Sequence, residues 1–209
     1  MKKWLTYILI LLAVALVGSK SIFFKKLSGL NNTVNEKFDA VAFSKKLWDE
    51  KLPTKLDSAI ELTSLIHSIE ADPADAFAKY SNAMDIGNYR YSLVKVTGTV
   101  ADINENDMLL RVNNADSLMT VILATEYIYG NAIRDASSLV DIKDFSNTAD
   151  LNAISEELNK IVRIIVIPPF KKLVSRGNRV TVTAAVEMNK EHIKLSKMEL
   201  IPVRIKILP

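Results

Sequence analysis

Residues 89–103 read YRYSLVKVTGTVADI, a run that is rich in β-branched and aromatic residues. Such a composition is typical of a β-strand. The side-chain alternation that starts with Tyr89 and Tyr91 changes parity at Val94. A glycine inside a strand often marks a bulge or a sharp bend, and Gly98 accounts for this change of parity. The run therefore predicts a long first strand that bends at Gly98.

Four further strand-like segments follow, and each is bounded by residues that favour turns. They are residues 108–112, 118–124, 179–188 and 193–208. The spacing of the early strands predicts two short antiparallel hairpins. Five strands, a bent first strand and a helical insertion between strands 3 and 4 indicate an OB-like Greek-key barrel. A different small barrel would have the same list of strands. The order of the strands and of the helical insertion along the chain is therefore the main argument for the OB-like fold.

The helical insertion covers about residues 125–172. Asn147 or Thr148 is suited to cap a long helix, because apolar residues recur at helical spacing after it. Pro168 and Pro169 predict the end of that helix, since proline lacks the backbone donor that a helix interior requires.

A helical subdomain is expected over residues 38–86, packed on the barrel of residues 87–208. Pro53 separates its first helix from a second, which the apolar spacing predicts over about residues 56–70. Asp72 precedes a proline and predicts the cap of a third helix. The fold class is therefore α+β.

The first 26 residues have the pattern of an export signal. Lysines flank an apolar run over residues 4–17, which indicates a signal anchor that stays uncleaved. A cleaved signal peptide and a buried N-terminal helix are the alternatives. Residues 27–37 read as a polar linker. We expect the rest of the chain to lie in the periplasm or another extracytoplasmic space, anchored to the inner membrane.

The formal net charge of +3 arises in this N-terminal segment. Residues 1–26 hold five basic residues and no acid, whereas residues 27–209 hold 22 basic and 24 acidic residues. A slightly acidic exported domain is unsuited to binding the phosphate backbone of a nucleic acid. We therefore expect no nucleic-acid partner.

No catalytic or metal-binding motif is present in the sequence. The absence of cysteine excludes disulfides, thiolate metal ligands and cysteine nucleophiles. The two histidines, His67 and His192, are far apart and match no metal-binding spacing. The six glycines are isolated, which disfavours a phosphate-binding loop. We expect no metal site, no cofactor and no enzymatic activity.

Arg134 and Asp135 follow Gly130 at a predicted transition from strand to helix. The two side chains suit a polar pocket, in which Arg134 holds a carboxylate or sugar hydroxyls and Asp135 accepts hydrogen bonds. The alternative is an internal ion pair that fastens the insertion to the barrel, which is the usual role of such pairs.

Three tyrosines and a second arginine complete the predicted ligand-binding set. Tyr89, Arg90 and Tyr91 alternate at the entrance of the first strand. Aromatic side chains on the face of an OB-type barrel can stack on bases or sugar rings. Tyr127 lies in the segment after the third strand and is a candidate for the same pocket. The alternative is ordinary packing, with Arg90 facing solvent.

Four stretches carry a resemblance to a known family. They are FDAVAFSKKLWDEKLP (38–53), IGNYRYSLVKVTGTV (86–100), GNAIRDASSLVDIKDF (130–145) and IPVRI (201–205). Through them the chain, from about residue 38 to residue 207, resembles domain-of-unknown-function family 2291, bacterial predicted periplasmic proteins that include many lipoproteins. Members are often encoded beside ABC transporters of the ribose type, so the resemblance implies a link with carbohydrate uptake. Ser19 stands where a lipoprotein has its acylated cysteine, so the apolar run must itself provide any anchor.

These observations predict a membrane-anchored, extracytoplasmic, non-enzymatic protein that binds a transporter component or a small carbohydrate ligand. The competing hypothesis is an enzyme that acts on carbohydrate or cell-wall material, with carboxylates such as Asp135 and Asp144 as acid and base. Such an enzyme needs two carboxylates in one cleft, about 5–10 Å apart. The sequence gives no reason to pair any two of its acids.

Overall fold

The computed structural model describes residues 4, 7, 38–84, 87–114 and 117–209. The predicted anchor and linker lie outside these ranges except at positions 4 and 7. The chain separates into two units, Met1–Phe38 and Asp39–Pro209, and the second unit contains the sheet and the helices that pack on it. Within the described ranges, no helix is long and apolar enough to cross a membrane.

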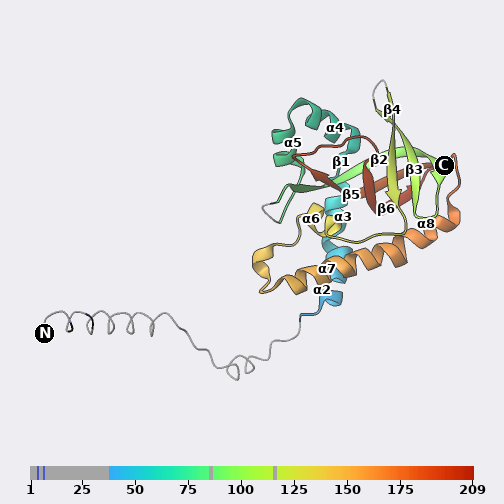
Figure 1. Ribbon diagram of the computed structural model, residues 1–209. Helices are drawn as coiled ribbons and strands as arrows, with labels where there is room; N and C mark the ends of the chain where they lie inside the picture. Colours follow the sequence, from blue (N-terminus) through green and yellow to red (C-terminus); the bar gives the residue numbers. More distant parts are fainter. Residues whose placement is uncertain (1–3, 5–6, 8–37, 85–86, 115–116) are drawn as a thin grey trace. The chain divides into compact units, whose positions relative to one another are not determined.

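Five strands close into a ring of hydrogen-bonded pairs (Figure 1). The first strand, β2, pairs with β3 and β5, while β6 lies between β4 and β5. All of these pairs are antiparallel except β4 with β6, which is parallel. This Greek-key order confirms the predicted OB-like fold. The strands are β2 (Tyr89–Ile103), β3 (Asp107–Asn114), β4 (Ser117–Ala124), β5 (Arg179–Asn189) and β6 (Glu199–Ile207).

Strand β2 is shared between two neighbours, and Gly98 lies close to where they meet. Residues 89–99 of β2 pair with β5, and pairing with β3 begins at Thr99. A Cβ atom at Gly98 would lie 2.8 Å from the backbone oxygen of Arg111 in β3. The register shift falls between Val100 and Asp102. The bulge is therefore displaced from the predicted position, and Gly98 instead permits a close approach of two backbones.

The interior of the ring is filled by aliphatic side chains that alternate along the strands. Val96, Leu110, Leu123 and Val182 come from four different strands, and each is at most 2% exposed. Leu65 of helix α4 (Leu62–Ala71) belongs to the same cluster. Helix α4 and the ring thus share one hydrophobic core.

The region before the ring contains one short strand that the sequence did not predict. Instead of one helix over residues 56–70, β1 (Ile60–Glu61) separates α3 from α4 and pairs in parallel with β2 at Val94. Because β3 joins β2 only from Thr99 onward, this edge of β2 is open at Val94 and accepts β1. Asp72 caps the next helix as predicted, accepting backbone hydrogen bonds at 3.0 and 3.1 Å. The helices are α2 (Ala40–Lys46), the π-helical η2 (Leu47–Lys51), α3 (Leu52–Asp57), α4 and α5 (Pro73–Tyr80).

The insertion between β4 and β5 forms a helical layer along one side of the ring (Figure 1). Asn147 caps its long helix as predicted, accepting from the backbone nitrogen of Asp150 at 2.9 Å. Pro168 and Pro169 do not end the helical segment. The π-helical turn η4 precedes them, and α8 begins at Ile167, so Pro168 lies in the first turn of α8, where no backbone donor is needed. The elements are α6 (Ala132–Ser137), the 3₁₀ turn η3 (Ile142–Asp144), α7 (Thr148–Ile161), the π-helical η4 (Val162–Val166) and α8 (Ile167–Leu173).

Candidate functional site

A cavity of about 250 Å³ opens between the start of β2, the short helix α6 and the beginning of α7. Four of the six predicted ligand-binding residues line it, two from β2 and two from α6. The described lining residues are Ala83, Met84, Gly87, Tyr89, Tyr91, Asn131, Arg134, Asp135, Ile142, Thr148, Leu151 and Asn152.

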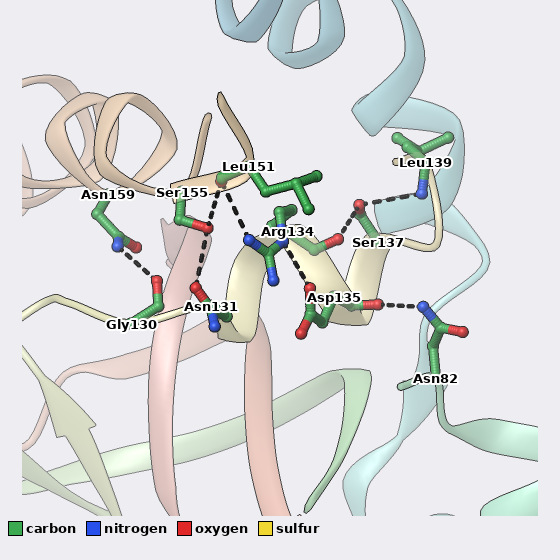
Figure 2. A network of polar contacts seen from close by, with 10 residues as sticks. All are labelled: Asn82, Gly130, Asn131, Arg134, Asp135, Ser137, Leu139, Leu151, Ser155 and Asn159. Carbon is green, nitrogen blue, oxygen red and sulfur yellow. Dashed lines mark hydrogen bonds and ion pairs between the residues drawn. The ribbon is translucent and has the colours of Figure 1, made fainter. Parts of the chain in front are cut away.

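The Arg134–Asp135 pair is buried in the wall of this cavity (Figure 2). Nε of Arg134 donates to Oδ1 of Asp135 over 2.7 Å, and the two side chains are 6% and 5% exposed. Nη1 of Arg134 donates to the backbone carbonyl of Leu151 in α7, at 3.0 Å. Charges buried this deeply require such bonds, because desolvating an unpaired charge is costly. The pair therefore links α6 to α7 and also faces the cavity.

Asn82 fixes helix α6 against strand β2. Its Nδ2 donates to the backbone carbonyl of Asp135 at 2.8 Å (Figure 2). Its own backbone exchanges two hydrogen bonds with Tyr91, of 2.8 and 2.9 Å. On α6 itself, the hydroxyl of Ser137 donates to the carbonyl of Arg134 at 2.7 Å. The residues that face the cavity are thus held in place from outside it, as a preorganised site requires.

Two polar residues of α7 hold the beginning of α6 from the other side. Ser155 donates to the side-chain oxygen of Asn131 at 3.1 Å, and Asn159 donates to the carbonyl of Gly130 at 2.9 Å (Figure 2). Both are buried among the apolar residues of α7. Sequence reasoning missed them, although polar residues four apart on the apolar face of a helix are the signal that identifies such contacts.

The cavity offers several hydrogen-bonding groups to a ligand. Nη2 of Arg134 makes no hydrogen bond with a described residue. Asn131, Thr148 and Asn152 add amide and hydroxyl groups, and Leu151 contributes an apolar wall. Sequence reasoning missed Thr148 and Asn152 as lining residues, because polar residues in the first turns of a helix are also typical of caps and solvated faces.

Tyr91 is a titratable group of the cavity whose pKa is shifted. Burial raises the pKa of its phenol above the ordinary value of 10.0. The negative charges of Glu187 and Asp135, and a hydrogen bond with Glu187, raise this pKa further, while Arg134 lowers it. Glu187 lies directly opposite Tyr91 on β5. The phenol is therefore a neutral hydrogen-bonding group at physiological pH.

The raised pKa of Tyr91 predicts a specific loss of stability in alkali. The unfolded chain releases this proton near pH 10 and the folded chain only at higher pH. The stabilisation is therefore fully present below pH 10 and is lost as the pH rises toward the folded pKa. Denaturant unfolding between about pH 8 and pH 11 should show the free energy of unfolding falling more steeply in wild type than in Tyr91→Phe. Equal slopes for the two proteins would contradict the assignment.

Arg90 and Tyr127 are not among the residues that line the cavity. Arg90 donates from Nη1 to the carbonyls of Gly87 and Tyr89, at 2.8 and 2.7 Å, and its side chain lines a different hollow. Tyr127 is 65% exposed and is not part of the cavity lining. Its neighbour Tyr129 carries the guanidinium of Arg163 over its ring, 5.1 Å from the centroid.

The two carboxylates of the enzymatic hypothesis line different cavities. Asp135 faces the cavity between β2, α6 and α7, where it pairs with Arg134. Asp144 lines a neighbouring cavity of about 360 Å³. In the part of the chain that the structure describes, no group of three or more histidine, aspartate or glutamate side chains is placed to hold a metal ion.

Residues 12–206 match a family described as "Predicted periplasmic lipoprotein (DUF2291)". The chain belongs to this family. Membership confirms the resemblance inferred from the sequence, and it supports an extracytoplasmic location. The family's function is unknown, so membership adds no activity. This member's sequence contains no cysteine to carry a lipid.

One solved structure supports the fold of this family member. A crystal structure of an OB-fold protein from Thermotoga maritima is 26% identical, with a TM-score of 0.72, over 82% of this chain and 99% of that chain. The Stn1–Ten1 complex of S. pombe is 17% identical over 56% of this chain and 57% of that chain. Its TM-score of 0.27 is too low to support an argument. A comparison with curated proteins finds no match.

Proposed function

We propose that this protein is a non-enzymatic, extracytoplasmic binding protein that takes a small polar ligand into the cavity between β2, α6 and α7. Carbohydrate is the ligand class that we favour, in an accessory role to uptake, with the apolar N-terminal segment as membrane anchor. One observation carries the proposal, which is that residues from β2 and from the insertion converge on a single cavity.

The chemistry of the lining suits a sugar. A sugar presents hydroxyl groups at its rim and C–H groups on its faces, so it needs planar hydrogen-bonding side chains and aromatic surface together. Arg134, Asp135 and Asn152 provide the first, and Tyr89 and Tyr91 provide the second. Ligand pockets usually measure about 300–1,000 Å³, so the cavity is sized for one sugar ring rather than an oligosaccharide.

The lining also argues for binding rather than hydrolysis. Asp135 is the one carboxylate among the described lining residues, and its charge is matched by Arg134. Glycoside hydrolysis in most families uses two carboxylates across one cleft. A single carboxylate that is paired with a guanidinium is better suited to accepting hydrogen bonds from a ligand than to moving protons.

Replacing Tyr89 with alanine should weaken ligand binding with little effect on folding, because its ring is half-exposed at the cavity. The full-length protein in detergent would be titrated by calorimetry with D-ribose, D-glucose and D-galactose. For any sugar that binds, we expect the dissociation constant of Tyr89→Ala to rise roughly tenfold, since an aromatic face in contact with a ligand contributes about 1.4 kcal/mol.

Tyr127→Ala provides the matched control, because it removes another exposed tyrosine, one that is not part of the cavity lining. It should leave the dissociation constant unchanged. Absence of heat and of any thermal shift with all three sugars would remove the support for carbohydrate. Equal weakening by both variants would show that the ligand binds elsewhere.

A further inference from the structure

Two π-helical turns from distant parts of the chain line one groove on the helical layer. Trp48 comes from η2, Ile165 and Val166 come from η4, and Val203 comes from β6. The groove has a volume of about 340 Å³ and is separate from the cavity of the candidate ligand site. π-Helical turns are rare and occur frequently at functional sites, so two of them at one groove require an explanation.

An apolar stripe runs from η4 at this groove into α8. Ile165, Pro169 and Leu173 follow at intervals of four residues, which places them on one side of the helix. Ile165 and Leu173 are 62% and 73% exposed, and Ile164 is equally accessible. We call Trp48, which is partly buried at the groove, together with Ile165, Pro169 and Leu173 the Trp48 face. Single exposed apolar residues are ordinary, but a contiguous set marks a surface that contacts a partner or a membrane.

The segments that carry this face are basic, although the exported chain is not. Residues 40–57 and 162–173 together hold seven basic and three acidic residues, whereas residues 27–209 hold 22 basic and 24 acidic. Three of the seven, Lys45, Arg163 and Lys171, pair with carboxylates, whereas Lys46, Lys51, Lys55 and Lys172 form no ion pair with a described residue. Lys172 lies beside Leu173 in the last turn of α8. An apolar stripe with Trp and Leu, bordered by lysines, has the composition of surfaces that rest in the headgroup region of a bilayer.

We propose that the Trp48 face rests on an anionic lipid bilayer, a proposal that depends on the membrane attachment in the proposed function and not on the ligand. The eleven residues 27–37 span at most about 40 Å when extended, so an anchored chain keeps its fold near the membrane surface. The described fold begins with α2, which packs against α7 in the helical layer. Lysines on both segments complement anionic headgroups.

The two tryptophans of the chain, Trp4 and Trp48, allow a direct test. Full-length Trp4→Phe has Trp48 as its only tryptophan and would be reconstituted in vesicles of phosphatidylcholine and phosphatidylglycerol. A side chain at this interface lies within about 5–10 Å of the acyl boundary. We therefore expect Trp48 fluorescence to fall to about half when the phosphatidylcholine carries brominated acyl chains.

Charge substitutions on the face provide the specificity control. Adding Ile165→Glu and Leu173→Glu should abolish the quenching without loss of folding, because both side chains are exposed. Leu118→Glu changes an exposed leucine of β4, far from these helices in sequence, and should leave the quenching intact. Circular dichroism would confirm that each variant is folded.

Flotation of the same vesicles separates the two ways in which the idea can fail. Protein that floats with the vesicles while Trp48 stays unquenched would overturn the docking proposal and leave the anchor intact. Protein that does not float would overturn both. A dimer in sedimentation velocity that the two glutamates dissociate, with Trp48 unquenched, would assign the face to a second copy of the chain instead.

Discussion

Arg134→Met is expected to lower the free energy of unfolding by about 3–5 kcal/mol, which is the typical effect of removing one partner of a buried ion pair. Asp135 is 5% exposed on its side chain and would lose the guanidinium that now donates to it at 2.7 Å. The carbonyl of Leu151 would lose its donor as well. Methionine occupies a similar volume, so the loss reports on charge and hydrogen bonding rather than on a void. Equilibrium unfolding in urea, monitored by circular dichroism, measures it.

Two companion variants show whether this loss comes from the buried charge. Arg134→Met combined with Asp135→Leu removes both charges and should recover a large part of the stability, since apolar replacement of a whole buried pair is often neutral. Arg176→Met breaks an ion pair with Asp102 in which the arginine is 67% exposed, and it should cost at most about 1 kcal/mol. Similar losses from Arg134→Met and Arg176→Met would mean that water reaches Asp135 through the cavity.

The sequence could identify the cavity residues that lie on regular elements. Tyr89 and Tyr91 are two apart on a strand, so they point to the same side, and both reach the cavity. The same alternation places Arg90 on the opposite side, where its guanidinium bonds to the backbone of its own neighbours. The period of two along a strand thus already argued against Arg90 as a residue of the same cavity. Tyr127 lies in an irregular segment without a period, so no pattern could orient it.

Other features depended on tertiary contacts that no local pattern contains. Strand β1 forms because the edge of β2 at Val94 is unoccupied by β3, which is a property of the register and not of residues 60 and 61. The helix that runs past Pro168 is a similar case. A local rule ends the helix there, but the preceding π-helical turn provides a new start. The succession of the five strands along the chain, in contrast, could be predicted from segment lengths and turn residues.

The close approach at Gly98 predicts the second large effect, because valine at this position should cost about 3 kcal/mol, at the upper end for overpacking. A Cβ there would meet the backbone oxygen of Arg111 at 2.8 Å and a methyl group of Val112 at 3.1 Å. A backbone oxygen in a paired strand cannot rotate away as a side chain would. Residue 98 also pairs with Val180 of β5, so β2 cannot move without breaking that ladder. Denaturant unfolding of Gly98→Val measures the cost.

Gly87→Ala is the control, because we expect the fold to tolerate a side chain at this position. A Cβ at Gly87 meets nothing within 4 Å, and no positive φ holds this residue in a conformation reserved for glycine. Its free energy of unfolding should stay within about 0.5 kcal/mol of wild type. Gly98→Ala should fall between the two variants, because it adds the clashing Cβ without the further methyl groups of valine. If Gly98→Val proves as stable as Gly87→Ala, β2 and β3 lie further apart at Arg111 than 2.8 Å implies.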